Sequence, residues 1–214
     1  MVFTSLQFLF VFLPITLGLY HAVPTRLRNV ILLAASLVFY TWGGGIFVLI
    51  LLVSIGVDYV LGGMAGKAYR DGNRRLKRAA VAGSAMVNIG LLIYFKYSVF
   101  FVNQINEIAL DFGFPEVAWV NVALPIGISF YTFQSMSYTI DVSRGAAEPV
   151  DGILDFALYV ALFPQLIAGP IVRYHELADQ LRGRSSRFSD FAEGAVRFVH
   201  AGTTANLEKD ILTN

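Results

Sequence analysis

Apolar residues in this chain gather in long blocks instead of alternating with polar residues. Five blocks come near the ~20 residues that a helix needs to cross the hydrocarbon core of a membrane. They cover residues 2–20, 29–42, 46–63, 79–101 and 121–140, and a sixth apolar stretch covers residues 154–172. The pattern therefore predicts an all-α fold, a polytopic integral membrane helix bundle.

The sixth stretch differs from the others because it contains helix breakers. Residues 162–174 read LFPQLIAGPIVRY and include Pro164, Gln165 and Pro170. Proline interrupts a helix, and irregular backbone at membrane depth is tolerated only inside protein or beside a watery cavity. We therefore expect a re-entrant broken-helix segment, which dips into the membrane and returns to the side from which it came.

The charges between the blocks predict the orientation of the chain. Residues 64–78 hold six basic residues and one acid, which is typical of a cytoplasmic loop. Arg26 and Arg28 fall on the same side, so the N-terminus points outward. Residues 102–118 carry three acids and no Lys or Arg, which suits the outer face. A re-entrant sixth stretch also keeps the five arginines of residues 173–197 on the cytoplasmic side.

Composition supports a membrane protein and excludes several kinds of site. The 214 residues are 56% hydrophobic and only 14% charged, whereas a soluble domain carries about 25% charged residues. A net charge of +1 gives no global attraction to nucleic acid, and the absence of cysteine excludes disulfides and thiolate nucleophiles. The three histidines are too scattered to predict a metal site.

The sequences at the two ends of the chain predict two regions. Residues 1–20 are uncharged and lack a small-residue cleavage site, so we expect a retained membrane helix instead of a signal peptide. Residues 186–200 have apolar positions at helical spacing, typical of an amphipathic helix. We therefore predict a transmembrane region over residues 1–185 and an amphipathic helix with a polar tail over residues 186–214.

Polar residues inside the apolar blocks are the candidates for function, because lipid makes them costly. The densest set lies in residues 123–145, and it predicts either hydrogen bonding between helices or the lining of a cavity. Asp58, near the inner end of its block, is expected to reach the cytoplasmic surface or to pair with a basic residue. The cavity-lining candidates are Ser129, Tyr131, Gln134, Tyr138, Pro164, Gln165 and Pro170.

One short motif, His175-x-x-x-Asp179, has the form seen in some soluble acyltransferases. Short motifs of this kind arise by chance, and the soluble two-lobed fold that uses this one does not fit so apolar a chain. We therefore expect His175 to be a loop residue and not a catalytic one.

Several motifs together resemble those of membrane-bound O-acyltransferases. They are LPIGISFYTFQSMSYTIDVSRG and LYVALFPQLIAGPIVRY, with the opening FTSLQFLFVFLP and the FYTWGG turn. The most similar type is the bacterial one that includes the alginate O-acetylation membrane subunit. Members of the family are about twice as long, and their catalytic histidine lies in the second half. No position here matches that histidine, so the resemblance implies an N-terminal fragment with no catalytic residue, inactive alone.

The resemblance also implies what an intact enzyme would do. A cytoplasmic acyl donor, acetyl-CoA or an acylated carrier, would meet the hydroxyl of an exported polysaccharide such as alginate, and the family's histidine would act as general base. The candidates above would line the funnel between them, with no bound cofactor or metal. Other acetylation subunits and the bacterial inner membrane would be its partners. Two further interpretations stay open, a small transporter or channel with a re-entrant pore element and a non-catalytic membrane scaffold.

Overall fold

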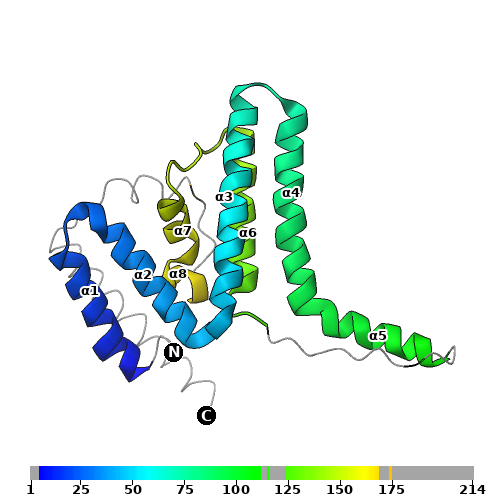
Figure 1. Cartoon of the computed structure of the whole chain (residues 1–214), viewed down its shortest axis with the longest axis horizontal. Coiled ribbons are helices and arrows are strands. Elements are labelled where there is room, and N and C mark those ends of the chain that lie inside the picture. Colours follow the sequence, from blue (N-terminus) through cyan, green and yellow to red (C-terminus); the bar gives the residue numbers. More distant parts are fainter. Residues whose placement is uncertain (1–4, 112–114, 116–123, 169–173, 175–214) are drawn as a thin grey trace, which may run out of the picture. The chain divides into compact units, whose positions relative to one another are not determined.

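The computed structural model describes residues 5–111, 115, 124–168 and 174, and these residues are mainly helical (Figure 1). The chain divides into two compact units, Met1–Leu181 and Arg182–Asn214. All described residues belong to the first unit. The predicted amphipathic helix over residues 186–200 and the histidine motif at His175 lie outside the described residues.

The helices lie where the apolar blocks predict them, although their ends differ. A π-helical turn, Phe8–Phe12, leads into the first helix, and a second one, Ile93–Tyr97, joins α4 to α5. The helices are α1 Leu13–Ala22, α2 Thr25–Gly44, α3 Val48–Arg70, α4 Arg74–Leu92, α5 Ser98–Asp111, α6 Ile128–Arg144, α7 Ile153–Ala161 and α8 Phe163–Ala168.

Two continuous helical stretches, Thr25–Arg70 and Arg74–Asp111, are long and apolar enough to cross a membrane by length and composition. Only 22% and 6% of their most apolar windows are buried within the protein. Their apolar side chains therefore face outward, which is the distribution expected of helices whose surroundings are lipid instead of water. The structure thus supports an all-helical membrane protein.

The predicted basic loop over residues 64–78 is wrong in its bounds. Helix α3 continues to Arg70 and α4 begins at Arg74, so only residues 71–73 link them. Gly72 adopts a φ of 65° in this turn, and the Asn73 side chain caps α4 by accepting a hydrogen bond from the Leu76 backbone N–H at 3.1 Å. Hydropathy marks where lipid contact stops, whereas the caps decide where a helix ends. The predicted outer loop 102–118 is likewise helical as far as Asp111.

Helix α3 packs against both α4 and α6 (Figure 1). Gly62 of α3 faces the Tyr138 ring of α6 so closely that a Cβ atom on Gly62 would collide with it. Seven residues further along each chain segment, Tyr69 meets Gly145 in the same way. The two helices therefore run in the same direction, and α6 ends beside the basic end of α3. Small residues at such contacts let membrane helices approach closely.

Candidate functional site

Helix α7 lies along α2, and two hydrogen bonds set their register. The Asn29 side-chain amide, near the start of α2, donates to the Asp155 carboxylate at 2.9 Å. Further along, the Phe163 backbone N–H donates to the Ser36 hydroxyl at 3.2 Å. Because residue numbers rise together in both pairs, α7 runs in the same direction as α2. The start of α7 thus lies beside the start of α2, where the basic residues Arg26 and Arg28 are.

The second of these hydrogen bonds lies near the middle of α2. This helix has 20 residues, so it is about 30 Å long, equal to the hydrocarbon thickness of a bilayer. Ser36 stands about 16 Å from Thr25 and about 12 Å from Gly44 at 1.5 Å per residue. If α2 crosses the membrane, Phe163 therefore lies near its centre.

The helix is interrupted at this depth. Helix α7 ends at Ala161, and Leu162 leaves the helical conformation with a ψ of 116°. Helix α8 begins at Phe163, which places Pro164 in the first turn, where a missing N–H breaks no hydrogen bond. The Leu162 carbonyl accepts from the Gln165 and Leu166 backbone N–H groups at 3.0 and 2.9 Å. The predicted interruption is therefore confirmed, two residues before Pro164.

The start of α6 lies against α8, just after the interruption. Gly127, with a φ of 72°, precedes α6, and a Cβ atom there would lie 2.7 Å from the Leu166 carbonyl oxygen. The Tyr40 hydroxyl of α2 donates to the Ile126 carbonyl at 3.0 Å. Irregular backbone from two segments thus meets beside α2. We call this region, residues 162–166 and 125–127 with Ser36 and Tyr40, the mid-depth break.

Tyr40 and Trp42, two aromatic residues near the end of α2, occupy different environments. Tyr40 is only 2% exposed and belongs to the core. Trp42 is 66% exposed, as an interfacial residue would be. Tyr40 faces inward, where its hydroxyl donates to the Ile126 carbonyl instead of a headgroup.

Three of the predicted site residues, Tyr131, Gln134 and Tyr138, are buried on α6. The Gln134 side-chain amide donates to the Tyr159 carbonyl of α7 at 2.7 Å. The Tyr138 hydroxyl accepts from the Val150 backbone N–H at 3.0 Å, and its ring lies 4.6 Å from that of Phe156. Gln134 and Tyr138 therefore join α6 to α7 and to the segment before it. Whether they also line a cavity stays a prediction.

Other polar atoms near the same helices are buried and have no hydrogen-bond partner in the described part of the chain. They are the Tyr131 and Ser135 hydroxyls and the Gln165 Nε2. Leaving such a group unsatisfied costs ~1–3 kcal/mol, so a partner from water, substrate or another segment would stabilise it. Of the remaining candidates, Ser129 is half-buried, Pro164 is exposed and Pro170 lies outside the described residues.

A buried polar cluster joins α3 to α4, and sequence reasoning missed it. Asp58 is fully buried. The Ser84 hydroxyl donates to its carboxylate at 2.6 Å, and the Asn88 side-chain amide donates to it at 2.8 Å. The expectation that Asp58 reaches the surface or pairs with a basic residue is therefore wrong. The signal was the Ser84-x-x-x-Asn88 spacing, which puts two polar groups on one face of an apolar helix.

The part of the chain that the structure describes contains no group of three or more His, Asp or Glu side chains that could hold a metal ion. The buried polar side chains are mainly amides and hydroxyls, with two carboxylates, Asp58 and Asp141. They are suited to hydrogen bonding with a polar, uncharged group.

The fold and the site together define a helical membrane protein in which an interrupted helix meets the start of another helix beside α2. Comparison with known proteins then gives its relatives. The chain is 45% identical over 202 residues to "Probable alginate O-acetylase AlgI" of Pseudomonas aeruginosa and 43% identical over 202 residues to the protein of the same name in Azotobacter vinelandii. It is 28% identical over 220 residues to a peptidoglycan O-acetyltransferase of Helicobacter pylori.

These similarities confirm the resemblance to O-acyltransferases. The chain is a homologue of the alginate O-acetylases over 93% of its own length. It spans 38% and 40% of the length of those two relatives and 40% of the peptidoglycan enzyme. No protein-family model matches the chain, and no solved structure matches it significantly.

Proposed function

We propose that this chain forms part of a membrane-bound O-acyltransferase that acetylates hydroxyl groups of an exported polysaccharide, alginate being the candidate. The observation that carries the proposal is 45% identity over 93% of the chain with an alginate O-acetylase. The acyl donor is acetyl-CoA or an acylated carrier. The enzyme works in the bacterial inner membrane with other acetylation subunits.

The mid-depth break supplies the physical reason for such chemistry at this place. A polysaccharide hydroxyl and a cytoplasmic donor can meet only where the bilayer is interrupted by polar groups. The buried Tyr131 hydroxyl and Gln165 Nε2, both without hydrogen-bond partners in the described residues, are available to hold the acceptor or the acetyl carbonyl. In this proposal the residues 154–172 are re-entrant and form one wall of the passage.

No residue of this chain is proposed as the general base of the reaction. In the family that the sequence resembles, a histidine from the second half performs that step. The described residues contribute hydrogen-bonding groups and the scaffold that holds them. Positioning of this kind can account for several kcal/mol of a barrier.

A chimera tests the proposal directly. The segment of the Pseudomonas aeruginosa relative that matches this chain is replaced by the chain, and the chimera is expressed in a strain lacking its own alginate O-acetylase. We expect acetyl groups to return to the secreted alginate, measured per uronic acid residue. A chimera that reaches the membrane in normal amount and leaves alginate unacetylated contradicts the proposal.

Substitutions in the chimera then test the site. Gln165→Ala removes the partnerless buried amide, and we expect acetylation to fall about tenfold, which corresponds to ~1.4 kcal/mol. Gln104→Ala, on the exposed face of α5, is the matched control and should change nothing. Equal activities of the two variants would show that Gln165 does not contribute to the site, without contradicting the proposed function.

Transport is the main competing function, and homology with O-acetylases disfavours it. A channel or transporter would carry solute when the chain alone is reconstituted in liposomes. We expect no flux above that of empty liposomes.

A further inference from the structure

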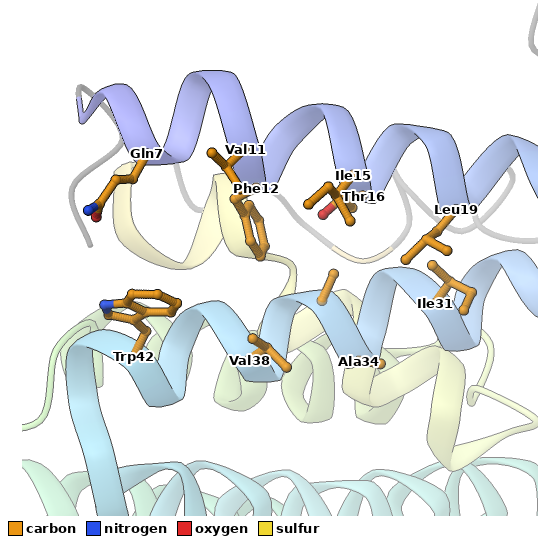
Figure 2. A pocket seen from close by; sticks show the side chains of 11 residues that line it. Gln7, Val11, Phe12, Ile15, Thr16, Leu19, Ile31, Ala34, Val38 and Trp42 are labelled. Atoms are coloured by element: carbon orange, nitrogen blue, oxygen red, sulfur yellow. The ribbon is translucent and has the colours of Figure 1, made fainter.

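Helices α1 and α2 are separated by an apolar groove that the proposed acyl transfer does not use (Figure 2). The groove encloses about 590 Å³. Side chains from both helices point into it, with Gln7 and Trp42 near one end and Leu19 and Ile31 near the other (Figure 2). Among the described residues that line it, the polar groups are those of Gln7, Thr16 and the indole N–H of Trp42. The groove therefore suits a hydrocarbon chain.

The inner part of the groove suits one lipid tail. If α2 crosses the membrane with Ser36 near its centre, a tail of the cytoplasmic leaflet, about 15 Å long, ends near Ser36. The groove itself runs over 11 residues of α2, about 16 Å, between Ile31 and Trp42. Ala34 lies between them and is exposed into the groove, so little side-chain volume fills its middle. Val38 and Ile15, on the two walls, are each 57% exposed. The walls are thus open to the surrounding lipid.

A cation lies just beyond the Ile31 end. The Arg28 guanidinium stacks over the Tyr20 ring of α1 at 5.1 Å, which directs it toward the space between the two helices. Its Nε is buried and has no hydrogen-bond partner in the described residues. The carboxylate that lies along this part of α2, Asp155, accepts a hydrogen bond from Asn29 instead. Arg28 is therefore available to an anion.

We propose that the α1–α2 groove binds one anionic phospholipid, with its phosphate on Arg28 and an acyl chain extending along the groove as far as Ala34 and Ala35. Charge complementarity favours an anionic lipid over a neutral one, because a basic residue near the membrane surface contributes ~1 kcal/mol toward anionic headgroups. The positive-inside pattern places Arg28 at the cytoplasmic leaflet, where such headgroups lie. The inference depends on membrane insertion and not on acyl transfer.

The test counts bound lipids on the purified chain. The 214-residue protein is reconstituted in nanodiscs of equal parts phosphatidylglycerol and phosphatidylcholine, released into mild detergent and analysed by native mass spectrometry. We expect one retained phosphatidylglycerol. Arg28→Gln should lower its occupancy about fivefold, the equivalent of ~1 kcal/mol. Arg26→Gln, two residues earlier and exposed, should leave the occupancy unchanged.

A second pair of variants tests the groove itself. Ala34→Phe fills the middle of the groove and should abolish retention of the lipid, whereas Ala82→Phe, the same change on an exposed face of α4, should not. All four variants are first checked for normal membrane insertion and a single peak in gel filtration. The proposal is overturned if Arg28→Gln behaves like Arg26→Gln, or if Ala34→Phe behaves like Ala82→Phe. Ala34→Phe would behave like Ala82→Phe if another protein segment, and not a lipid, occupied the groove.

Discussion

Single polar residues inside the helices determine which surfaces can face lipid. Asp58 lies in the middle of α3, and its carboxylate is enclosed by the Ser84 hydroxyl and the Asn88 amide. The sequence shows that such a residue must have partners, because a charge in lipid is costly. It cannot show which partners, since Ser84 and Asn88 are 26 and 30 residues away and their approach depends on how α3 and α4 pack.

Removal of this carboxylate should destabilise the pair of helices. Asp58→Ala removes the acceptor of the buried Ser84 hydroxyl and of one N–H of the Asn88 amide, which keeps its hydrogen bond to the Ser84 carbonyl. We therefore expect the free energy of unfolding to fall by about 2 kcal/mol. Reversible unfolding in mixed micelles measures this change. The same substitution at Asp71, in the exposed turn after α3, is the control. Equal losses at both positions would show that the cluster contributes nothing specific.

Helices are the scale at which the sequence predicts this protein best. The apolar blocks locate the membrane helices, and Pro164 indicates the interruption of the sixth stretch. The ends of α3 and α4 could not be predicted, because the basic residues that look like a loop lie on helical turns capped by Asn73. The partner of the interruption, Ser36, carries no signal of its own in the sequence.

Close packing of α3 on α6 gives a prediction with a neighbouring control. A Cβ atom at Gly62 would collide with the Tyr138 ring, whereas one at Gly63 meets nothing within 4 Å. We expect Gly62→Ala to destabilise the protein by about 1–3 kcal/mol through overpacking. Gly63→Ala should stabilise it by up to about 1 kcal/mol, because alanine favours helix. The free energy of unfolding of both variants is measured in the same micelles. A Gly62→Ala protein more stable than Gly63→Ala would contradict this packing.

The interruption between α7 and α8 depends on a hydrogen bond from outside the segment. Ser36→Ala leaves the buried Phe163 N–H without its acceptor, and we expect a loss of about 1–3 kcal/mol. Thr41→Ala, on an exposed face of the same helix, removes only a hydroxyl that bonds the Leu37 carbonyl and should cost less. Comparable thermal midpoints for the two variants would show that Ser36 does not hold the break.

At the scale of the whole helix bundle, the described residues form two distinguishable ends. Basic residues gather where α3 ends and α4 begins, and α6 ends at the same place, beside Tyr69. The positive-inside rule assigns this end to the cytoplasm. The link between α2 and α3, residues 45–47, then lies at the outer surface.

Cysteine labelling checks this orientation on intact cells, since the natural chain has no cysteine. A membrane-impermeant maleimide should label Ile46→Cys from outside and should leave Asp71→Cys unlabelled until the cells are opened. Arg184→Cys should behave like Asp71→Cys if the sixth stretch is re-entrant. Strong labelling of Arg184→Cys on intact cells would instead indicate a complete crossing.

Helix α7 runs beside α2 and is interrupted at Leu162, near the middle of the bilayer if α2 crosses it. Spin labels at Leu154, near the start of α7, and at Pro164, just after the break, report depth in nanodiscs by their collision rates with oxygen and with a water-soluble nickel chelate. The account predicts Leu154 near the cytoplasmic headgroups and Pro164 close to the bilayer centre. Equal depths, or Pro164 at the opposite surface, would contradict it.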